Sequence, residues 1–183
     1  MQDKPETQPI HQAFFNSETG QPFATCLMCN NELKDTQYVI EKAFKKHPSH
    51  NLTEVIFEYA MCVQCATKMH MELSEESRKR IEEYMAAMPR GDRNFTSIED
   101  AISHCAIKNS LVNDSTEYSI YCLCNGNEMV VGDLPYALSG EVQDEIMQLL
   151  SAKSLDILDD FIGNHFSGPP EVREILRRRP VLI

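Results

Sequence analysis

The spacing of apolar residues between positions 37 and 88 predicts two strands followed by two helices. Apolar runs at 38–44 and 55–61 flank a polar segment, 47–51, so we expect a pair of strands joined by a loop. From Cys62 onward the apolar residues recur at the spacing of one helix face. Ser74 is the expected N-cap of a second helix, because two glutamates follow it at the positive end of the helix dipole.

The middle of the chain shows the pattern of a further helix and a β-hairpin. Residues 96–99 have the spacing of a capping box, and the helix that follows would carry a buried stripe as far as Cys105. Runs at 117–124 and 128–131 flank Asn125-Gly126. Asn-Gly between two such runs is a strong hairpin signal, in which both turn residues take positive φ.

Three more helices are expected near the C-terminus. Ser139 precedes the first, Ser154 is the expected N-cap of the second, and Pro170 would begin the third. We find no internal repeat in the sequence.

These patterns divide the chain into three parts. Residues 1–12 are rich in Gln, Pro and acidic groups and are expected to form a flexible tail. The segment 89–93 contains Pro and Gly and breaks the helical pattern, so it is the candidate linker. We expect a cysteine-bearing module at 13–89 and an acidic region at 94–183, either separate or packed as one globule. The expected fold class is α+β.

The charge of the chain narrows the range of partners. The 183 residues include 17 Lys and Arg against 28 Asp and Glu, which gives a formal net charge of −11. The acidic excess is concentrated in residues 91–165. Such a surface repels nucleic acids and anionic membranes and favours neutral or basic proteins. The sequence shows no secretory signal and no apolar stretch of membrane-spanning length, so we expect a cytoplasmic protein.

Four of the seven cysteines form two CxxC pairs, Cys26 with Cys29 and Cys62 with Cys65. A tight turn would direct the first two sulfurs at one point, and the opening turn of a helix would direct the other two there. Four thiolates match the tetrahedral shell that zinc prefers. We expect the helix N-terminus to favour the thiolates of the second pair. Asn30 follows the first pair, where the turn needs a residue that tolerates a left-handed backbone.

The order of these elements resembles a known group of zinc modules. A CxxC turn, a strand hairpin and a CxxC that opens a helix occur in that order in treble-clef and zinc-ribbon-like modules, which include LIM-type and many ribosomal and adaptor fingers. The resemblance covers about residues 24–73. It implies one structural zinc ion held by four protein sulfurs with no open coordination position. The sequence differs in its long intervening segment and in the helix that follows, and its hairpin lacks the Asp-His pair of the related HNH nucleases.

Weaker candidates have simpler interpretations. Cys105, Cys122 and Cys124 would form a second metal site only if they met near His104, and a buried core explains them more simply. The histidines at 47 and 50 fit a solvated hairpin tip. Three carboxylates, Asp156, Asp159 and Asp160, lie opposite the apolar face of their helix.

We find no phosphate loop, nucleophile elbow or HExxH motif in the sequence, so a non-enzymatic function is favoured. The leading hypothesis is a structural zinc protein that acts through protein–protein contact, with segment 91–165 as its surface. The first alternative is a redox or metal sensor that uses the CxxC thiols. The second is a nucleic-acid-binding zinc finger, which would use Lys42, Lys45, Lys46 and the basic run 78–80. Hydrolysis at a cleft assembled from distant residues is a further alternative.

Overall fold

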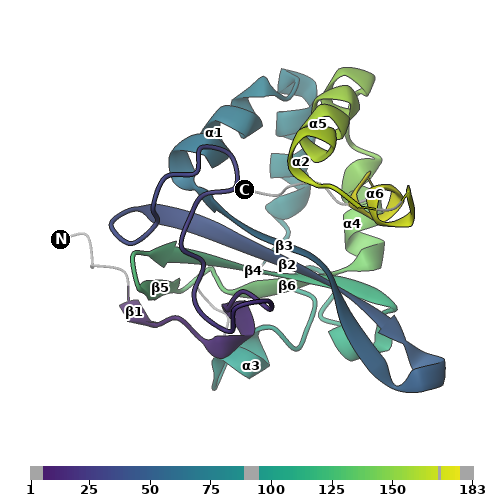
Figure 1. Ribbon diagram of the computed structural model, residues 1–183. Coiled ribbons are helices and arrows are strands. Elements are labelled where there is room, and N and C mark those ends of the chain that lie inside the picture. Colours follow the sequence, from purple (N-terminus) through teal and green to yellow (C-terminus); the bar gives the residue numbers. More distant parts are fainter. Residues whose placement is uncertain (1–5, 89–94, 169, 178–183) are drawn as a thin grey trace.

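The computed structural model describes residues 6–88, 95–168 and 170–177, and it shows a mixed α/β fold (Figure 1). All the strands of the described residues belong to one antiparallel sheet. The strands are β1 (Glu6–Pro9), β2 (Gln37–His47), β3 (Leu52–Cys62), β4 (Glu117–Asn125), β5 (Glu128–Val131) and β6 (Tyr136–Ser139). The helices are α1 (Val63–Glu72), α2 (Glu75–Met85), α3 (Ile98–Ala101), α4 (Gly140–Met147), α5 (Ala152–His165) and α6 (Pro170–Arg177).

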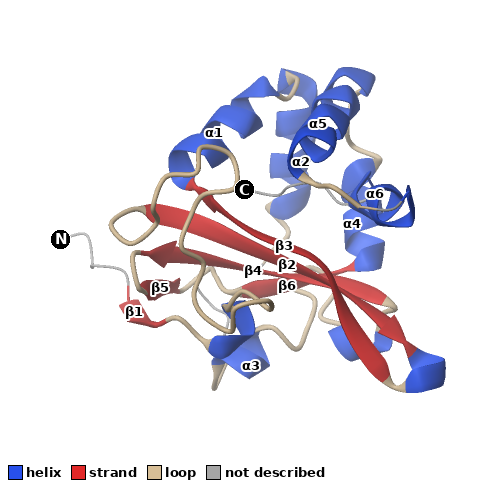
Figure 2. Ribbon diagram, in the orientation of Figure 1, coloured by secondary structure: helices blue, strands red, loops and turns tan. Residues whose placement is uncertain are grey.

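The sheet brings together strands from both halves of the chain. Its order is β1-β5-β4-β2-β3, and β6 pairs with the first part of β4. The central ladder joins β2 to β4 from Gln37↔Asn125 to Lys45↔Glu117. Figure 2 shows the long β2–β3 hairpin reaching well beyond the rest of the sheet.

Helices and loops cover the sheet on its two faces. Helices α1, α2, α4, α5 and α6 lie above one face, and the N-terminal segment with α3 lies against the other (Figure 1). Under the helices, Tyr121, Leu138 and Val142 belong to one apolar cluster. Phe14 from the N-terminal segment belongs to another, with Cys122 of the central strand β4. Adjacent residues of β4, Tyr121 and Cys122, thus contribute to different clusters, as expected from the alternation of side chains along a strand. The second cluster also includes Met69 and Phe161 from the helices.

A buried carboxyl group lies beneath the helices at the centre of the sheet. The Glu41 side chain is only 2% exposed. The Tyr59 hydroxyl donates a 2.5 Å hydrogen bond to one of its oxygens, and the Tyr121 hydroxyl donates a 3.0 Å bond to the other. Gln143, which is also buried, donates to the Tyr121 oxygen. Burial and the neighbouring Glu41 raise the pKa of Tyr59, so this phenol keeps its proton and remains a donor.

Two helices begin side by side and cap each other through four serines. Ser74 caps α2 and accepts from the Ser77 amide, and Ser151 caps α5 and accepts from the Ser154 amide. The Ser74 amide also donates to the Ser154 hydroxyl at 2.9 Å, and the Ser151 amide donates to the Ser77 hydroxyl at 2.8 Å. Each N-cap amide is therefore satisfied by a serine of the other helix.

The structure confirms most of the predicted elements and corrects several boundaries. The hairpin at 38–61, the N-cap Ser74, the helix after Ser139 and the helix from Pro170 are confirmed. The predicted helix through Cys105 is wrong, because α3 ends at Ala101.

Two further local predictions are also corrected. The second hairpin is confirmed, but its turn is Gly126-Asn127, and Gly126 alone of these residues takes positive φ, +58°. The N-cap of α5 is Ser151 and not Ser154. In both cases a contact with a distant segment holds the observed residues: the Gly126 amide donates to the Thr36 carbonyl oxygen, and the Ser151 amide donates to the Ser77 hydroxyl.

The structure joins the expected parts of the chain in one sheet. Residues 6–9 of the expected flexible tail 1–12 form β1, which pairs with β5, and Ile10 is buried. The regions 13–89 and 94–183 share one sheet, since β2 and β3 come from the first and β4 to β6 from the second. The expected linker at 89–93 lies outside the described residues.

Candidate metal centre

The first cysteine pair lies in a tight turn at residues 25–32. The Cys26 amide donates to the Asn31 carbonyl oxygen at 2.9 Å, and the Asn30 amide donates to the Cys26 carbonyl oxygen at the same distance. Asn30 has a φ of 57°, the left-handed backbone expected at this position. The turn therefore holds Cys26 and Cys29 on the same side of the chain.

The second pair lies where β3 runs directly into α1. Cys62 is the last residue of β3 and the N-cap of α1, and Cys65 follows in the first helical turn. The Leu27 amide donates to the Ala60 carbonyl oxygen at 2.9 Å, and this bond joins the cysteine turn to β3. Tertiary pairing therefore brings the two CxxC motifs together.

The four cysteine sulfurs converge on one point. The Sγ atoms of Cys26, Cys29, Cys62 and Cys65 all lie within 4.8 Å of one another. A tetrahedral site with metal–sulfur bonds of about 2.3 Å has sulfurs about 3.8 Å apart, and the Cys29–Cys62 separation is 3.9 Å. The donor set therefore fits a divalent ion that prefers thiolate ligands. Cys26 and Cys62 are buried and Cys29 is exposed.

The thiol pKa values differ from the sequence-based expectation. Burial raises the pKa of Cys26, but amide hydrogen bonds from Cys29, Cys62 and Met28 outweigh it and lower the pKa to about 7. The pKa values of Cys62 and Cys65 are raised, chiefly by burial. Burial thus outweighs the Cys65 amide, which lowers the pKa of Cys62, and the second pair is not favoured as thiolates, contrary to the expectation from the sequence. A bound cation would supply the positive charge that holds those two deprotonated.

The remaining cysteines do not form a second cluster. Among the residues that the structure describes, the four CxxC cysteines are the only group of three or more Cys, His, Asp or Glu close enough to hold a metal ion. Cys122 and Cys124 lie 3.6 Å apart in the core, whereas Cys105 accepts a hydrogen bond from Ser139. His104 contacts Ser103. This arrangement favours the buried-core interpretation.

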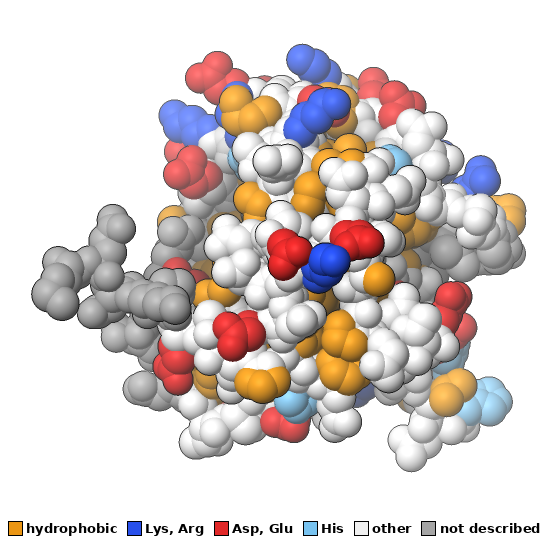
Figure 3. Space-filling view, turned by 60° about the vertical axis from the view of Figure 1, so that its left-hand side comes forward, with side chains coloured by type: hydrophobic (Ala, Val, Ile, Leu, Met, Phe, Trp, Pro, Cys, Tyr) orange, Lys and Arg blue, Asp and Glu red, His pale blue; other side chains and the backbone are white. Residues whose placement is uncertain are grey.

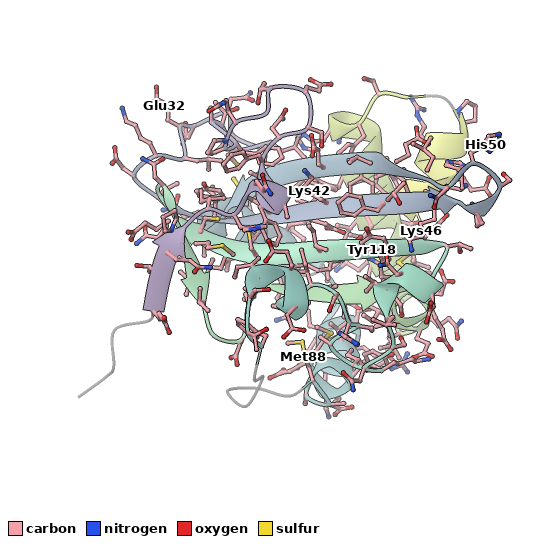
Figure 4. All side chains as sticks on the ribbon, turned by 90° about the horizontal axis from the view of Figure 1, so that it is seen from below. Glu32, Lys42, Lys46, His50, Met88 and Tyr118 are labelled. Carbon is pink, nitrogen blue, oxygen red and sulfur yellow. The ribbon has the colours of Figure 1, made fainter. Side chains whose placement is uncertain are left out.

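The candidate histidines of the hairpin lie away from the cysteine cluster. Figure 4 shows Glu32, in the cysteine turn, and His50, at the hairpin tip, at opposite ends of the sheet. His47 contacts Glu54, and His50 contacts Ser49. Of the three carboxylates on α5, Asp159 pairs with Arg177 at 3.1 Å.

Most of the basic residues that a nucleic acid would need are paired with acceptors. Lys42 is buried, 3.0 Å from Glu58, and Lys46 donates to Asn113. Lys79 and Arg80 each pair with a glutamate one helical turn away. On the face shown in Figure 3, basic side chains lie among acidic ones instead of forming a continuous patch. These pairings reduce the support for the nucleic-acid alternative.

Comparison with known proteins identifies no relative for this chain. No family model, no curated protein and no solved structure matches it. Within the described ranges, none of the helices combines the length and the apolar character needed to cross a bilayer.

Proposed function

We propose that the four cysteines hold one structural zinc ion and that the protein is a non-enzymatic cytoplasmic protein that acts through contacts with another protein. The convergence of the four sulfurs supports the zinc site. Four protein sulfurs fill the tetrahedral shell and leave no position for a substrate or an activated water. The ion would therefore fix the cysteine turn to the start of α1.

The order of elements around the site supports a treble-clef-like module. The cysteine turn is followed by the β2–β3 hairpin, and α1 begins at the second cysteine pair. In this arrangement the hairpin spans the two halves of the metal site. The helix α2 then extends the module, as the sequence pattern indicates.

A groove on the face of the sheet opposite the helices is the surface that we propose for partner binding. It has a volume of about 490 Å³ and lies between strands β2 to β4 and segment 99–113. Phe44 and Tyr118 stack along it with ring centroids 4.9 Å apart, and Val55 and Ile102 add apolar surface. Figure 4 looks onto this side of the sheet, with Lys42 and Tyr118 labelled. Such a groove suits an extended segment that inserts an apolar side chain.

Metal analysis tests the zinc assignment. We expect the purified protein to contain about one equivalent of zinc, measured by mass spectrometry after gel filtration. Cys29→Ser should lose most of it, because three sulfurs remain. Cys105→Ser is the matched control and should keep the full equivalent, since Cys105 lies outside the cluster. Wild-type protein without bound zinc, or equal zinc in the two variants, contradicts the proposal.

Affinity capture from the source cell tests the contact role. We expect proteins retained by the wild type to be lost with Tyr118→Lys, because a charge would replace an aromatic ring that lines the groove. Leu52→Lys is the control, since it places the same charge on an exposed residue of the hairpin. Identical retention by wild type, Tyr118→Lys and Leu52→Lys would argue against the groove as the contact surface.

A further inference from the structure

The structure contains two units with the same order of elements. The first unit consists of the turn at 24–33 followed by β2, β3, α1 and α2, and the second consists of the turn at 103–112 followed by β4, β6, α4 and α5. The second unit also contains β5, inserted between β4 and β6.

Strand register is the same in the two units. In the first, four consecutive pairs are Tyr38↔Cys62, Val39↔Met61, Ile40↔Ala60 and Glu41↔Tyr59. In the second, the corresponding pairs are Tyr118↔Ser139, Ser119↔Leu138, Ile120↔Ala137 and Tyr121↔Tyr136. The four pairs of the first unit therefore correspond, in the order given, to the four pairs of the second.

The two units are related by an approximate two-fold axis through the sheet. Their first strands, β2 and β4, pair antiparallel, and Glu41 lies directly opposite its own counterpart, Tyr121. Tyr38 pairs with Cys124, and the counterpart of Tyr38, Tyr118, pairs with Phe44. The axis therefore passes between Glu41 and Tyr121, beside the buried hydrogen-bond network.

The turns before the two first strands also match in their backbone hydrogen bonds. In the second turn the Cys105 amide donates to the Ser110 carbonyl oxygen, and the Asn109 amide donates to the Cys105 carbonyl oxygen, both at 2.8 Å. These bonds reproduce those of Cys26 and Asn30 described above. Asn109 has a φ of 54°, close to the 57° of Asn30. The Ala106 amide donates to the Ala137 oxygen, as the Leu27 amide does to Ala60.

From β3 into α2, each residue and its counterpart from β6 into α5 are a constant number of positions apart in the sequence. At some of these positions the two residues are identical. The identical pairs in these segments are Tyr59 and Tyr136, Ala60 and Ala137, Leu73 and Leu150, Ser74 and Ser151, and Ser77 and Ser154. The four-serine network is therefore a contact between equivalent helix ends. These correspondences show a repeat that the sequence analysis did not find.

We infer that the second unit is a copy of the metal-binding unit that no longer binds metal and retains one of the four ligands. The superposed registers place Cys105 at the position of Cys26, Lys108 at that of Cys29, Ser139 at that of Cys62 and Val142 at that of Cys65. The inference uses the proposed metal site of the first unit as its reference.

Direct contacts join the second turn to its helix where the metal would join the first. The Ser139 hydroxyl donates to the Cys105 sulfur at 3.6 Å. Lys108 reaches from the turn to α4 and forms ion pairs with Glu141 at 2.6 Å and Glu145 at 2.5 Å. Val142 is fully buried in the apolar cluster under the helices. A hydrogen bond, two ion pairs and an apolar contact thus replace four metal–sulfur bonds.

Restoring the three missing ligands tests the inference. The combined substitutions Lys108→Cys, Ser139→Cys and Val142→Cys, with the native Cys105, should raise bound cobalt(II) from about one to about two equivalents per chain. The thiolate-to-cobalt absorption should increase in proportion. The matched control carries Lys108→Ser with the same other two substitutions. With three sulfurs in the second unit, it should not retain a second equivalent through gel filtration.

A folded four-cysteine variant that binds only one equivalent overturns the inference. Every variant keeps the first site, so the cobalt bound there shows that the chain is folded and that the proposed metal site exists. A failure of the second site alone can therefore be distinguished from a failure of the proposed function. The wild type gives a second measurement that needs no substitution. After chelation, hydrogen exchange of the Asn30 amide should accelerate at least about tenfold while that of the Asn109 amide stays unchanged. Equal acceleration at both amides would show that the second turn also depends on metal, contrary to the inference.

Discussion

Removal of the metal with a chelator is expected to lower the melting temperature of the protein by at least about 10 °C. Structural zinc contributes on the order of 10 kcal/mol in isolated finger peptides, and loss of even ~5 kcal/mol shifts a domain of this size by that much. The cause is local, because without the ion the four metal–sulfur bonds are lost and Cys62 and Cys65, whose pKa values are raised, become protonated thiols. Differential scanning calorimetry with and without chelator measures the shift, and added zinc should restore it.

The two matched turn cysteines supply the controls for this experiment. Cys26 and Cys105 are both buried, and each accepts a hydrogen bond from the residue that begins its helix. Cys26→Ser should start from a low melting temperature and show little further response to chelator. Cys105→Ser should respond as the wild type does. A wild type whose melting temperature ignores the chelator would contradict the structural role of the metal.

Glu41→Ala is expected to lower the free energy of unfolding by about 3–5 kcal/mol. The substitution removes the acceptor for the Tyr59 and Tyr121 hydroxyls, and both lie beneath the helices where water does not replace it. Each unsatisfied buried hydroxyl costs about 1–3 kcal/mol, and the lost side-chain volume adds to this. Urea denaturation followed by circular dichroism measures the change.

Two milder variants test whether the hydrogen bonds account for that loss. Glu41→Gln keeps the volume and one acceptor oxygen but points an NH₂ group at a phenol, so a cost of about 1–2 kcal/mol is expected. Tyr121→Phe removes one donor and should cost about as much. If Glu41→Gln and Tyr121→Phe cost nothing while Glu41→Ala kept its full cost, the contribution of the carboxyl group would be packing alone.

Local patterns in the sequence predict the elements that depend on local physics. The β2–β3 hairpin follows from apolar runs around a polar loop, and α2 follows from Ser74 and its two glutamates. Local patterns do not predict the strand β1, because its sequence is polar and it becomes a strand only by pairing with β5. The strand β6 is also missed, because it is only four residues long and is defined by its ladder with β4.

The choice between neighbouring residues also depends on tertiary structure. Ser151 and Ser154 are equally good caps by propensity, and the contact with the start of α2 selects Ser151. Segment 36–38 likewise holds the turn Gly126-Asn127, since the Gly126 amide donates to the Thr36 carbonyl oxygen and the Tyr38 hydroxyl donates to the Gly126 oxygen. The candidate site is predictable because each CxxC motif is local. Its pKa pattern is not, because one of the amides that stabilise the Cys26 thiolate, that of Cys62, comes from a distant segment.

The repeat was missed for a related reason. The two units keep backbone hydrogen bonds and strand register, and few of their side chains are identical. Three of the four cysteine positions differ in chemistry between the units, so the most informative motif of the first unit is absent from the second. Geometry therefore shows the relationship more clearly than residue identity does.

The central position of β2 has a consequence for synthesis of the chain. Translation completes the first hairpin well before β4 leaves the ribosome, so one edge of β2 stays open during that interval. An open strand edge can pair with another nascent chain and aggregate. Glu41, Lys42, Lys45 and Lys46 place four charges along this strand, and charged side chains make such an edge a poor template for that pairing. Two of the four, Glu41 and Lys42, are buried in the folded protein. Protection of the strand edge during synthesis therefore requires two charged side chains to be buried after folding.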